Sequence, residues 1–176
     1  MSASDVTAIR ALAHPLRLRL LDLLRIDGPS TSTILADRTG ESTGSTSYHL
    51  RQLARHGFIA EAGREASGRE RWWCYVERQA LLEAEDGDAS RQLVRELLVL
   101  EGDALDRFLA EPDRTLDWDR TAFVQSRVVR LTPDELELLS ANLAEVCRPL
   151  RDTASSDVPT DARPVRILAL AFPTAP

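Results

Sequence analysis

Residues 32–56, STILADRTGESTGSTSYHLRQLARH, predict two short helices joined by a tight turn. The hydroxyl side chains of residues 30–32 offer N-cap oxygens for the first helix, which Gly40 ends. Residues 42–43 offer the same for a second helix, which runs to about residue 56. Ala36 lies four residues before Gly40. This spacing lets the second helix approach closely, while glycine takes the positive φ of the turn.

Another helix precedes this segment, and a hairpin follows it. Residues 15–26, PLRLRLLDLLRI, place leucines at helical spacing, and Gly28-Pro29 ends that helix. Residues 58–62 and 72–76 are typical of strands, and the tract between them carries Gly and Arg. Three helices followed by a two-stranded hairpin predict an α+β fold, a winged helix-turn-helix.

The second helix of the turn predicts a DNA-reading surface. Thr46 and Leu50 are expected to face inward, so small hydroxyls, one Tyr and one Arg share the opposite face. Such side chains can lie close to the floor of the major groove and offer donors and acceptors. Arginines of the hairpin tract suit phosphate or a narrow minor groove. The candidate DNA-binding residues are Thr43, Gly44, Ser45, Ser47, Tyr48, Arg51, Arg55, Arg64, Arg69 and Arg71.

The net charge of −6 conceals two halves of different sign. Residues 1–78 hold 11 Arg against 9 acidic residues, and residues 79–176 hold 11 Arg against 19. The chain has no Lys, so every basic side chain is an arginine. We therefore expect a DNA-binding domain over 1–78 and an acidic second domain over 79–176, which DNA would repel.

The front half resembles a known family. Residues 13–17 (AHPLR), 47–53 (SYHLRQL) and 57–59 (GFI) are similar to the winged-helix domain of ArsR-type bacterial transcription regulators, over about residues 6–78. The resemblance implies a homodimer that binds an imperfect palindrome near a promoter, usually as a repressor. It also places the base-contacting positions of the family on Thr43, Gly44, Ser47 and Tyr48.

Metal sensing is not expected. The Cys-x-Cys motif of the metal-sensing members is absent from residues 33–39, and the three histidines, His14, His49 and His56, all lie in the front half. Single histidines beside a proline or on a helix are mostly structural. We expect no metal and no cofactor.

The second half predicts a long helix and a small appendage. Residues 90–110 carry a leucine stripe, which we interpret as a dimerisation helix helped by residues 6–9; the alternative is a brace across the front domain of the same chain. Residues 124–131 and 165–172 are expected to be strands on either side of a helix capped at Thr132. An effector pocket is hypothesised at Trp118, Phe123 and Phe172.

Several classes of protein are excluded or disfavoured. No phosphate loop, nucleophile elbow or zinc-protease motif occurs, which argues against an enzyme. No apolar run is long enough for a membrane span and no signal peptide is evident, so we expect a cytoplasmic protein. Double-stranded DNA, a second copy of the chain and a small-molecule effector are the expected partners. The alternative is a winged helix that binds protein and lacks sequence-specific DNA binding.

Overall fold

The structure is a computed structural model that describes residues 3–62, 70–76, 87–111, 120–150, 159 and 161–174. The chain divides into two compact units, Met1–Asp106 and Arg107–Pro176. The predicted boundary between residues 78 and 79, which separates a DNA-binding domain from an acidic second domain, stays a prediction. Each unit is described by itself.

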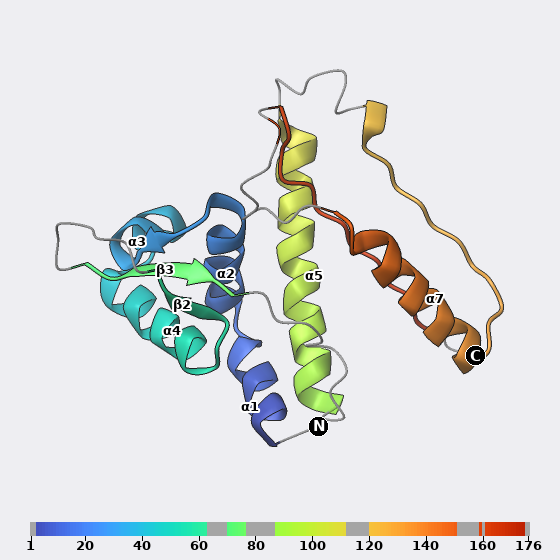
Figure 1. The fold of residues 1–176 in the computed structure, drawn as a ribbon, viewed down its shortest axis with the longest axis horizontal. Coiled ribbons are helices and arrows are strands. Elements are labelled where there is room, and N and C mark those ends of the chain that lie inside the picture. The colour runs from blue at the N-terminus through green and yellow to red at the C-terminus, as the bar shows by residue number, and fades with distance from the viewer. Residues whose placement is uncertain are drawn as a thin grey trace. The chain divides into compact units, whose positions relative to one another are not determined.

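The first unit holds five helices of the described chain and one small sheet (Figure 1). Its elements, in chain order, are α1 (Ala3–Leu12), α2 (Pro15–Asp27), β1 (Ser30–Thr31), α3 (Ser32–Thr39), α4 (Thr43–Arg55), β2 (Ile59–Glu61), β3 (Trp72–Tyr75) and α5 (Gly87–Ala110), whose last turn crosses into the second unit. The predicted helices and the predicted hairpin are confirmed.

Local capping explains where α2 begins and ends. The N-cap is His14, whose Nδ1 accepts a hydrogen bond from the backbone N–H of Leu16 at 3.2 Å. Pro15 follows in the first turn, where no N–H is needed from it. Gly28 ends the helix with φ 81°, a backbone angle that favours glycine.

The turn between α3 and α4 is closed by backbone hydrogen bonds. Gly40 takes the left-handed conformation, with φ 71° and ψ 22°. The N–H of Glu41 donates to the carbonyl of Ala36 at 3.0 Å, and the N–H of Gly40 donates to that of Asp37 at 3.4 Å. This pattern satisfies the last carbonyls of α3 in a Schellman motif. The predicted role of Gly40 is confirmed.

The sheet has three antiparallel strands in the order β1-β3-β2. Ile59 pairs with Tyr75, and Glu61 pairs with Trp73, so β2 and β3 form the predicted hairpin. The sequence did not predict β1, in which Ser30 pairs with Trp73. A two-residue strand has no periodicity of its own, and only its distant partner defines it.

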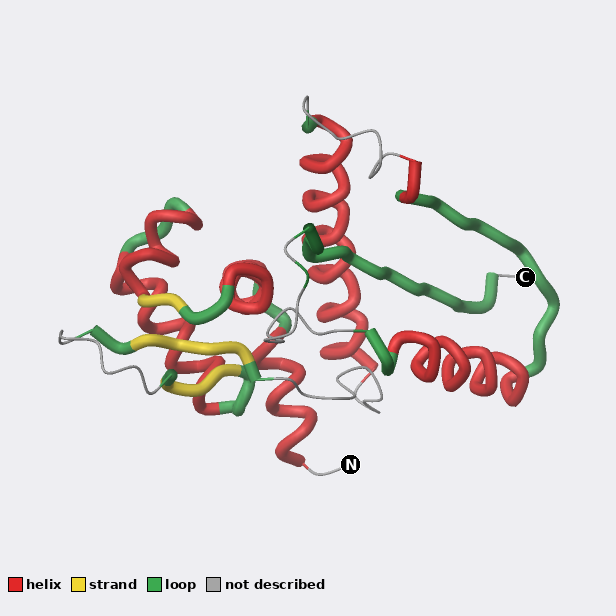
Figure 2. The backbone as a smooth tube through the Cα atoms, turned by 45° about the horizontal axis from the view of Figure 1, so that its top comes forward, coloured by secondary structure: helices red, strands yellow, loops and turns green. Residues whose placement is uncertain are grey.

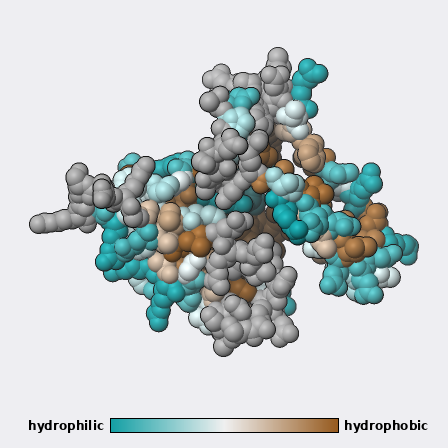
Figure 3. All heavy atoms as spheres, in the orientation of Figure 1, coloured by the Kyte–Doolittle hydropathy of each residue, from teal (hydrophilic) through white to brown (hydrophobic). Residues whose placement is uncertain are grey.

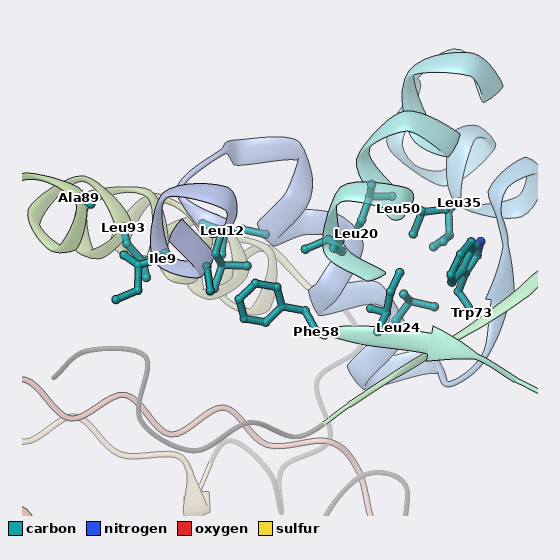
Figure 4. Packing of buried hydrophobic residues seen from close by; sticks show 14 residues of the cluster. Ile9, Leu12, Leu20, Leu24, Leu35, Leu50, Phe58, Trp73, Ala89 and Leu93 are labelled. Carbon is teal, nitrogen blue, oxygen red and sulfur yellow. The ribbon is translucent and has the colours of Figure 1, made fainter. Parts of the chain in front are cut away.

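One hydrophobic core joins the elements of the first unit (Figure 4). Leu20, Leu50 and Phe58, from α2, α4 and the segment before β2, are at most 2% exposed. Trp73 closes the core from β3. The buried hydrophobic residues are Ala8, Ile9, Leu12, Leu18, Leu20, Leu24, Leu35, Ala36, Leu50, Leu53, Phe58, Ile59, Trp73, Ala89 and Leu93.

The first turns of α5 belong to this core. Leu93 is fully buried and Ala89 is 7% exposed, and Figure 4 shows Leu93 beside Ile9 of α1. Ala8 and Ile9, expected to help dimerisation, are instead buried in the core of their own chain at 3% and 2% exposure. The start of α5 therefore braces the front unit, which is the alternative that the sequence left open.

The second unit holds α7 (Pro133–Cys147), which begins as predicted. Thr132 Oγ1 accepts from the N–H of Glu135, and Glu135 Oε2 accepts from the N–H of Thr132 at 2.7 Å, which completes a capping box. These hydrogen bonds stabilise the carboxylate and lower the pKa of Glu135. Figure 3 shows hydrophobic residues on the surface in the region of α7.

The prediction of strands at residues 124–131 and 165–172 is wrong. Both segments are loops in Figure 2, and no strand of the described residues pairs with them. Their apolar side chains lie in solvent, with Val128 88% exposed and Ile167 63% exposed. β-branched residues favour an extended backbone, but a strand also needs a neighbouring strand for its hydrogen bonds. The sequence pattern showed the β-branched residues, but it could not show whether a neighbouring strand is present.

No helix among the described residues is both long enough and apolar enough to cross a membrane.

Substitution of Leu93 tests the packing of α5 on the front unit. Because Leu93 is fully buried, Leu93→Ala should lower the free energy of unfolding by about 2–5 kcal/mol. Val99→Ala is the control on the same helix, since Val99 is 62% exposed, and should cost less than about 0.5 kcal/mol. Urea unfolding followed by circular dichroism measures both. Equal, small losses would contradict the packing.

Candidate nucleic-acid interface

The helix α4 is fixed by a cap at its start and a tight turn at its end. Ser42 is the N-cap, and its hydroxyl accepts from the backbone N–H of Ser45 at 3.1 Å. After the helix, Gly57 takes φ 73°, and the N–H of Phe58 donates to the carbonyl of Leu53 at 3.0 Å. The cap at Ser42 and the turn at Gly57 therefore fix where α4 begins and ends.

One face of α4 is buried in the core, so the opposite face is turned toward solvent. Thr46 and Leu50 are fully buried and Leu53 is 1% exposed, as the sequence predicted for the first two. Residues three or four apart share a face of a helix, so Tyr48, Arg51 and Arg55 lie together on the side away from these buried residues. Tyr48, at the centre of that outward face, is half exposed.

The structure brings seven of the predicted DNA-binding residues together on α4. Four of them are glycine, serine or threonine in its first turns, one is Tyr48, and two are arginines in its second half. The Arg51 Nε donates to the carbonyl of Ser47 at 3.1 Å, which holds this side chain along the helix. The seven residues are Thr43, Gly44, Ser45, Ser47, Tyr48, Arg51 and Arg55, all of them exposed or half-buried.

The hairpin carries the predicted wing. Arg71 is exposed and forms an ion pair of 3.4 Å with Glu61 across β2 and β3. The Thr33 hydroxyl donates to Glu70 at 2.9 Å, which ties the base of the wing to α3. Arg64 and Arg69 lie outside the described residues. Arg71 is thus the wing arginine whose position the structure gives.

A pair of histidines joins α4 to α2, a contact that the sequence did not predict. The rings of His14 and His49 lie 4.5 Å apart, centroid to centroid, and Tyr48 packs edge-on against His49 at 5.1 Å. The His49 Nδ1 is buried and has no hydrogen-bond partner. The two residues are 35 positions apart in the sequence, and no local signal connects them.

Burial lowers the pKa of both imidazoles. It is the main cause that lowers the pKa of His14, and the nearby Arg17 lowers it further. Burial also lowers the pKa of His49, with added repulsion from His14 and Arg17. Glu41 acts on both rings in the opposite direction, as Glu96 does on His14, and neither outweighs the burial.

Two of the three aromatic residues proposed for an effector pocket are exposed. Phe123 is 85% exposed and Phe172 is 74% exposed. Trp118 lies outside the described residues. The exposures do not support a pocket at these residues, and the hypothesis stays a prediction.

A cavity of about 320 Å³ opens elsewhere, within the first unit. Leu16 and Leu18 of α2 line it with Val99 and Leu100 of α5, and Glu41 borders it from the turn before α4. In the part of the chain that the structure describes, no three His, Cys, Asp or Glu side chains are grouped so that they could hold a metal ion.

Comparison with known proteins identifies the domain that contains α4. Residues 12–62 match the family described as a helix-turn-helix domain. This range runs from the end of α1 to the end of β2 and includes the turn at Gly40. The chain therefore contains a helix-turn-helix domain, a motif that places its second helix in the major groove of DNA. The match agrees with the prediction of a winged helix-turn-helix and with the prediction that the chain is not an enzyme.

Similar solved structures were also found. A "possible transcriptional regulator for arsenical resistance" is 29% identical, with 61% of this chain and 96% of that chain covered and a TM-score of 0.35. A variant of ZitR from Lactococcus lactis in the apo form is 14% identical, with 76% and 80% covered and a TM-score of 0.34. RV1404 from Mycobacterium tuberculosis is 17% identical, with 82% and 84% covered and a TM-score of 0.35. TM-scores this low do not define the fold of the whole chain. A comparison with curated proteins finds no match.

The histidine pair predicts acid sensitivity. A histidine whose pKa is lower in the folded chain than its ordinary 6.5 binds its proton more readily in the unfolded chain. Stability should therefore be greatest above about pH 7 and fall as the pH drops below 6.5 toward the folded pKa. Urea unfolding at a series of pH values measures this loss. The double variant His14→Gln, His49→Gln should show a smaller loss.

His56→Gln is the matched control, because His56 is the C-cap of α4 and not a member of the ring pair. It should keep the acid sensitivity of the wild type. An equal loss in the double variant and the wild type would show that other groups cause the effect.

Proposed function

We propose that the chain is a homodimeric transcription regulator of the ArsR type that binds a palindromic operator, usually as a repressor. The observation that carries the proposal is the outward face of α4, where seven candidate residues are presented by a helix fixed on its opposite side. The helix-turn-helix match over residues 12–62 supports DNA as the partner. Palindrome and repression rest on the family resemblance. Binding to chromosomal DNA would place the protein in the cytoplasm.

The chemistry of this face suits base readout at close range. Thr43, Gly44 and Ser47 are short, so the backbone of α4 can approach the floor of the groove. Tyr48 adds a hydroxyl at half exposure. Arg51 can reach a guanine edge, which presents two acceptors to a guanidinium. Discrimination between sequences needs both the short residues, which allow close approach, and the hydrogen-bonding groups of Tyr48 and Arg51.

Arginines at the border of this face are proposed to contact phosphates. Arg55 lies in the last turn of α4 and is exposed. Arg71 lies at the base of the wing, and Arg64 and Arg69 are proposed for its tip from the sequence. Each phosphate that an arginine neutralises releases condensed counterions, so binding should weaken steeply with salt.

Dimerisation is proposed to use the outward face of α5. Leu98 is 41% exposed and Leu105 is 49% exposed, and helical spacing places them on one side with Gly102 between them. A Cβ at Gly102 would have no neighbour within 4 Å in the single chain. Apolar side chains flanking a bare backbone favour close packing of a second helix. Two copies would then present two α4 helices to successive major grooves.

Control by a small-molecule effector belongs to the proposal through the family resemblance. The cavity beside α2 and α5 supports it, because its volume of about 320 Å³ suits a small ligand. Glu41 borders this cavity directly before the N-cap of α4. A ligand there would lie next to the turn that orients α4.

A winged helix that binds protein is the second candidate. The exposed apolar side chains of the second unit, such as Val128, are compatible with protein contact. The face of α4 decides between the two candidates, because Arg51 matters for sequence-specific DNA binding alone.

Arg51 provides the test of DNA recognition. Loss of a bidentate base contact costs about 1–3 kcal/mol of discrimination, so Arg51→Ala should weaken specific binding more than non-specific binding. Fluorescence anisotropy can measure both affinities, with an operator selected from a random pool by the wild type and with a mixed-sequence duplex. Arg107→Ala is the control, since Arg107 lies outside the helix-turn-helix domain. Equal loss on both duplexes would assign Arg51 to phosphate contact, and no selected sequence at all would favour the protein-binding candidate.

Leu105 provides the test of dimerisation. Leu105→Glu places a charge in the proposed apolar interface and should shift the protein toward monomer in sedimentation equilibrium. Gln92→Glu adds the same charge at an exposed position on another side of α5 and should leave the dimer intact. A wild type that is monomeric at every concentration would contradict the proposed interface, as would a dimer that Leu105→Glu leaves unchanged.

A further inference from the structure

Arg17 in α2 is a cation without an anion. Its Nε is buried and has no hydrogen-bond partner. Two other arginines of the first unit are paired with carboxylates: Arg38 with Asp27 at 2.6 Å, and Arg71 with Glu61 at 3.4 Å. Among the described residues, none forms an ion pair with Arg17.

Burial of this charge is unfavourable in the free chain. A half-buried guanidinium loses part of its hydration and gains nothing in return unless an acceptor is present. The same burial lowers the pKa of Arg17, and the nearby Tyr48 opposes this only in part. The guanidinium therefore lacks an anion that would compensate for its lost hydration.

The neighbours of Arg17 do not supply that counter-charge. The rings of His14 and His49 pack against each other, and Arg17 acts electrostatically on both and lowers the pKa of each, as burial also does. Glu41 is close enough to act on both rings, but it forms no ion pair with Arg17. Arg17 therefore has no ion-pair partner among the described residues at the junction of α2 and α4.

Tyr48 connects Arg17 with the outward face of α4. Tyr48 lies on the outward face of α4, half exposed, and interacts electrostatically with Arg17. His49, the next residue along α4, packs against both Tyr48 and His14. An anion that reaches Arg17 past Tyr48 would therefore lie at the edge of the proposed DNA-binding face.

We propose that Arg17 binds a backbone phosphate of the DNA on which α4 docks, at the edge of the major groove beside Tyr48. The guanidinium can offer parallel N–H donors to two oxygens of one phosphodiester. Arg17 was not among the candidate DNA-binding residues, because α2 is not the recognition helix and its arginines look like ordinary surface charges in the sequence. The proposal rests on the proposed function, since it presupposes that α4 enters a groove.

A salt titration with three forms of the full chain tests the proposal. The probe is a fluorescent mixed-sequence duplex, so that phosphate contacts dominate the affinity. For Arg17→Gln, the slope of log affinity against log salt should become shallower by about 0.9, the value for one phosphate contact. Arg17→Lys keeps the charge and should keep the slope of the wild type.

Arg25→Gln is the matched control on the same helix. Arg25 also lies beside a tyrosine, with its guanidinium carbon 5.8 Å from the centre of the Tyr75 ring. Tyr75 belongs to β3 and is distant in sequence from the face of α4. This variant loses the same charge and should bind with the slope of the wild type. If Arg25→Gln lowers the slope as much as Arg17→Gln, the effect is one of net charge and the proposal fails.

Thermal unfolding separates a DNA contact from a structural role. Because Arg17 lacks a partner in the free chain, Arg17→Gln should unfold at the wild-type temperature or above it. A lower unfolding temperature with an unchanged salt slope would assign Arg17 to the fold and overturn the proposal. Replacement of chloride by inorganic phosphate at constant ionic strength should raise the unfolding temperature of the wild type and of the Arg17 variants equally. Stabilisation that depends on Arg17, with an unchanged salt slope, would indicate a site for free phosphate and would also overturn it.

The same titration distinguishes this inference from the proposed function. If the wild type binds neither the mixed duplex nor any selected duplex, the proposed function fails and this inference fails with it. If the wild type binds and Arg17→Gln has the same slope, only the role of Arg17 is overturned.

Discussion

The packing of α3 against α4 across the left-handed Gly40 determines what the rest of the chain can present. Gly40 permits the change of direction, and the hydrogen bond from Glu41 to Ala36 closes it. Thr46 and Leu50 then face the core, which leaves the opposite side of α4 to solvent. The core beneath, continued by α1 and the start of α5, holds this orientation in place. The face of α4 that we propose to bind DNA thus follows from one turn and two buried side chains.

Features that depend on neighbouring residues could be predicted from the sequence, whereas those that depend on distant partners could not. The caps at Ser42 and Thr132 and the left-handed turn at Gly40 have their causes within a few residues. The strand β1 and the contact of His14 with His49 join residues more than 30 positions apart. The strands expected at 124–131 and 165–172 fail for the same reason, because their composition fits a strand but the described residues supply no neighbour to pair with.

Because the chain has no lysine, all of its basic side chains other than histidine are arginines, and these arginines differ in their surroundings. Arg38 and Arg71 are paired with carboxylates. Arg51 and Arg55 are exposed on α4, and Arg17 of α2 has a buried Nε without a hydrogen-bond partner. The acidic net charge of the chain is compatible with DNA binding, because it is a sum over all residues and arginines still lie on the outward face of α4.

Methylation interference on a selected operator tests the central claim most directly, that α4 of each protomer reads the major groove. Methyl groups at guanine N7 lie in the major groove and those at adenine N3 in the minor groove. The account predicts interference by guanine N7 methylation in two clusters, about 10 base pairs apart from centre to centre, one for each half-site. Interference restricted to adenine N3, or none at a sequence that the protein protects, would contradict it.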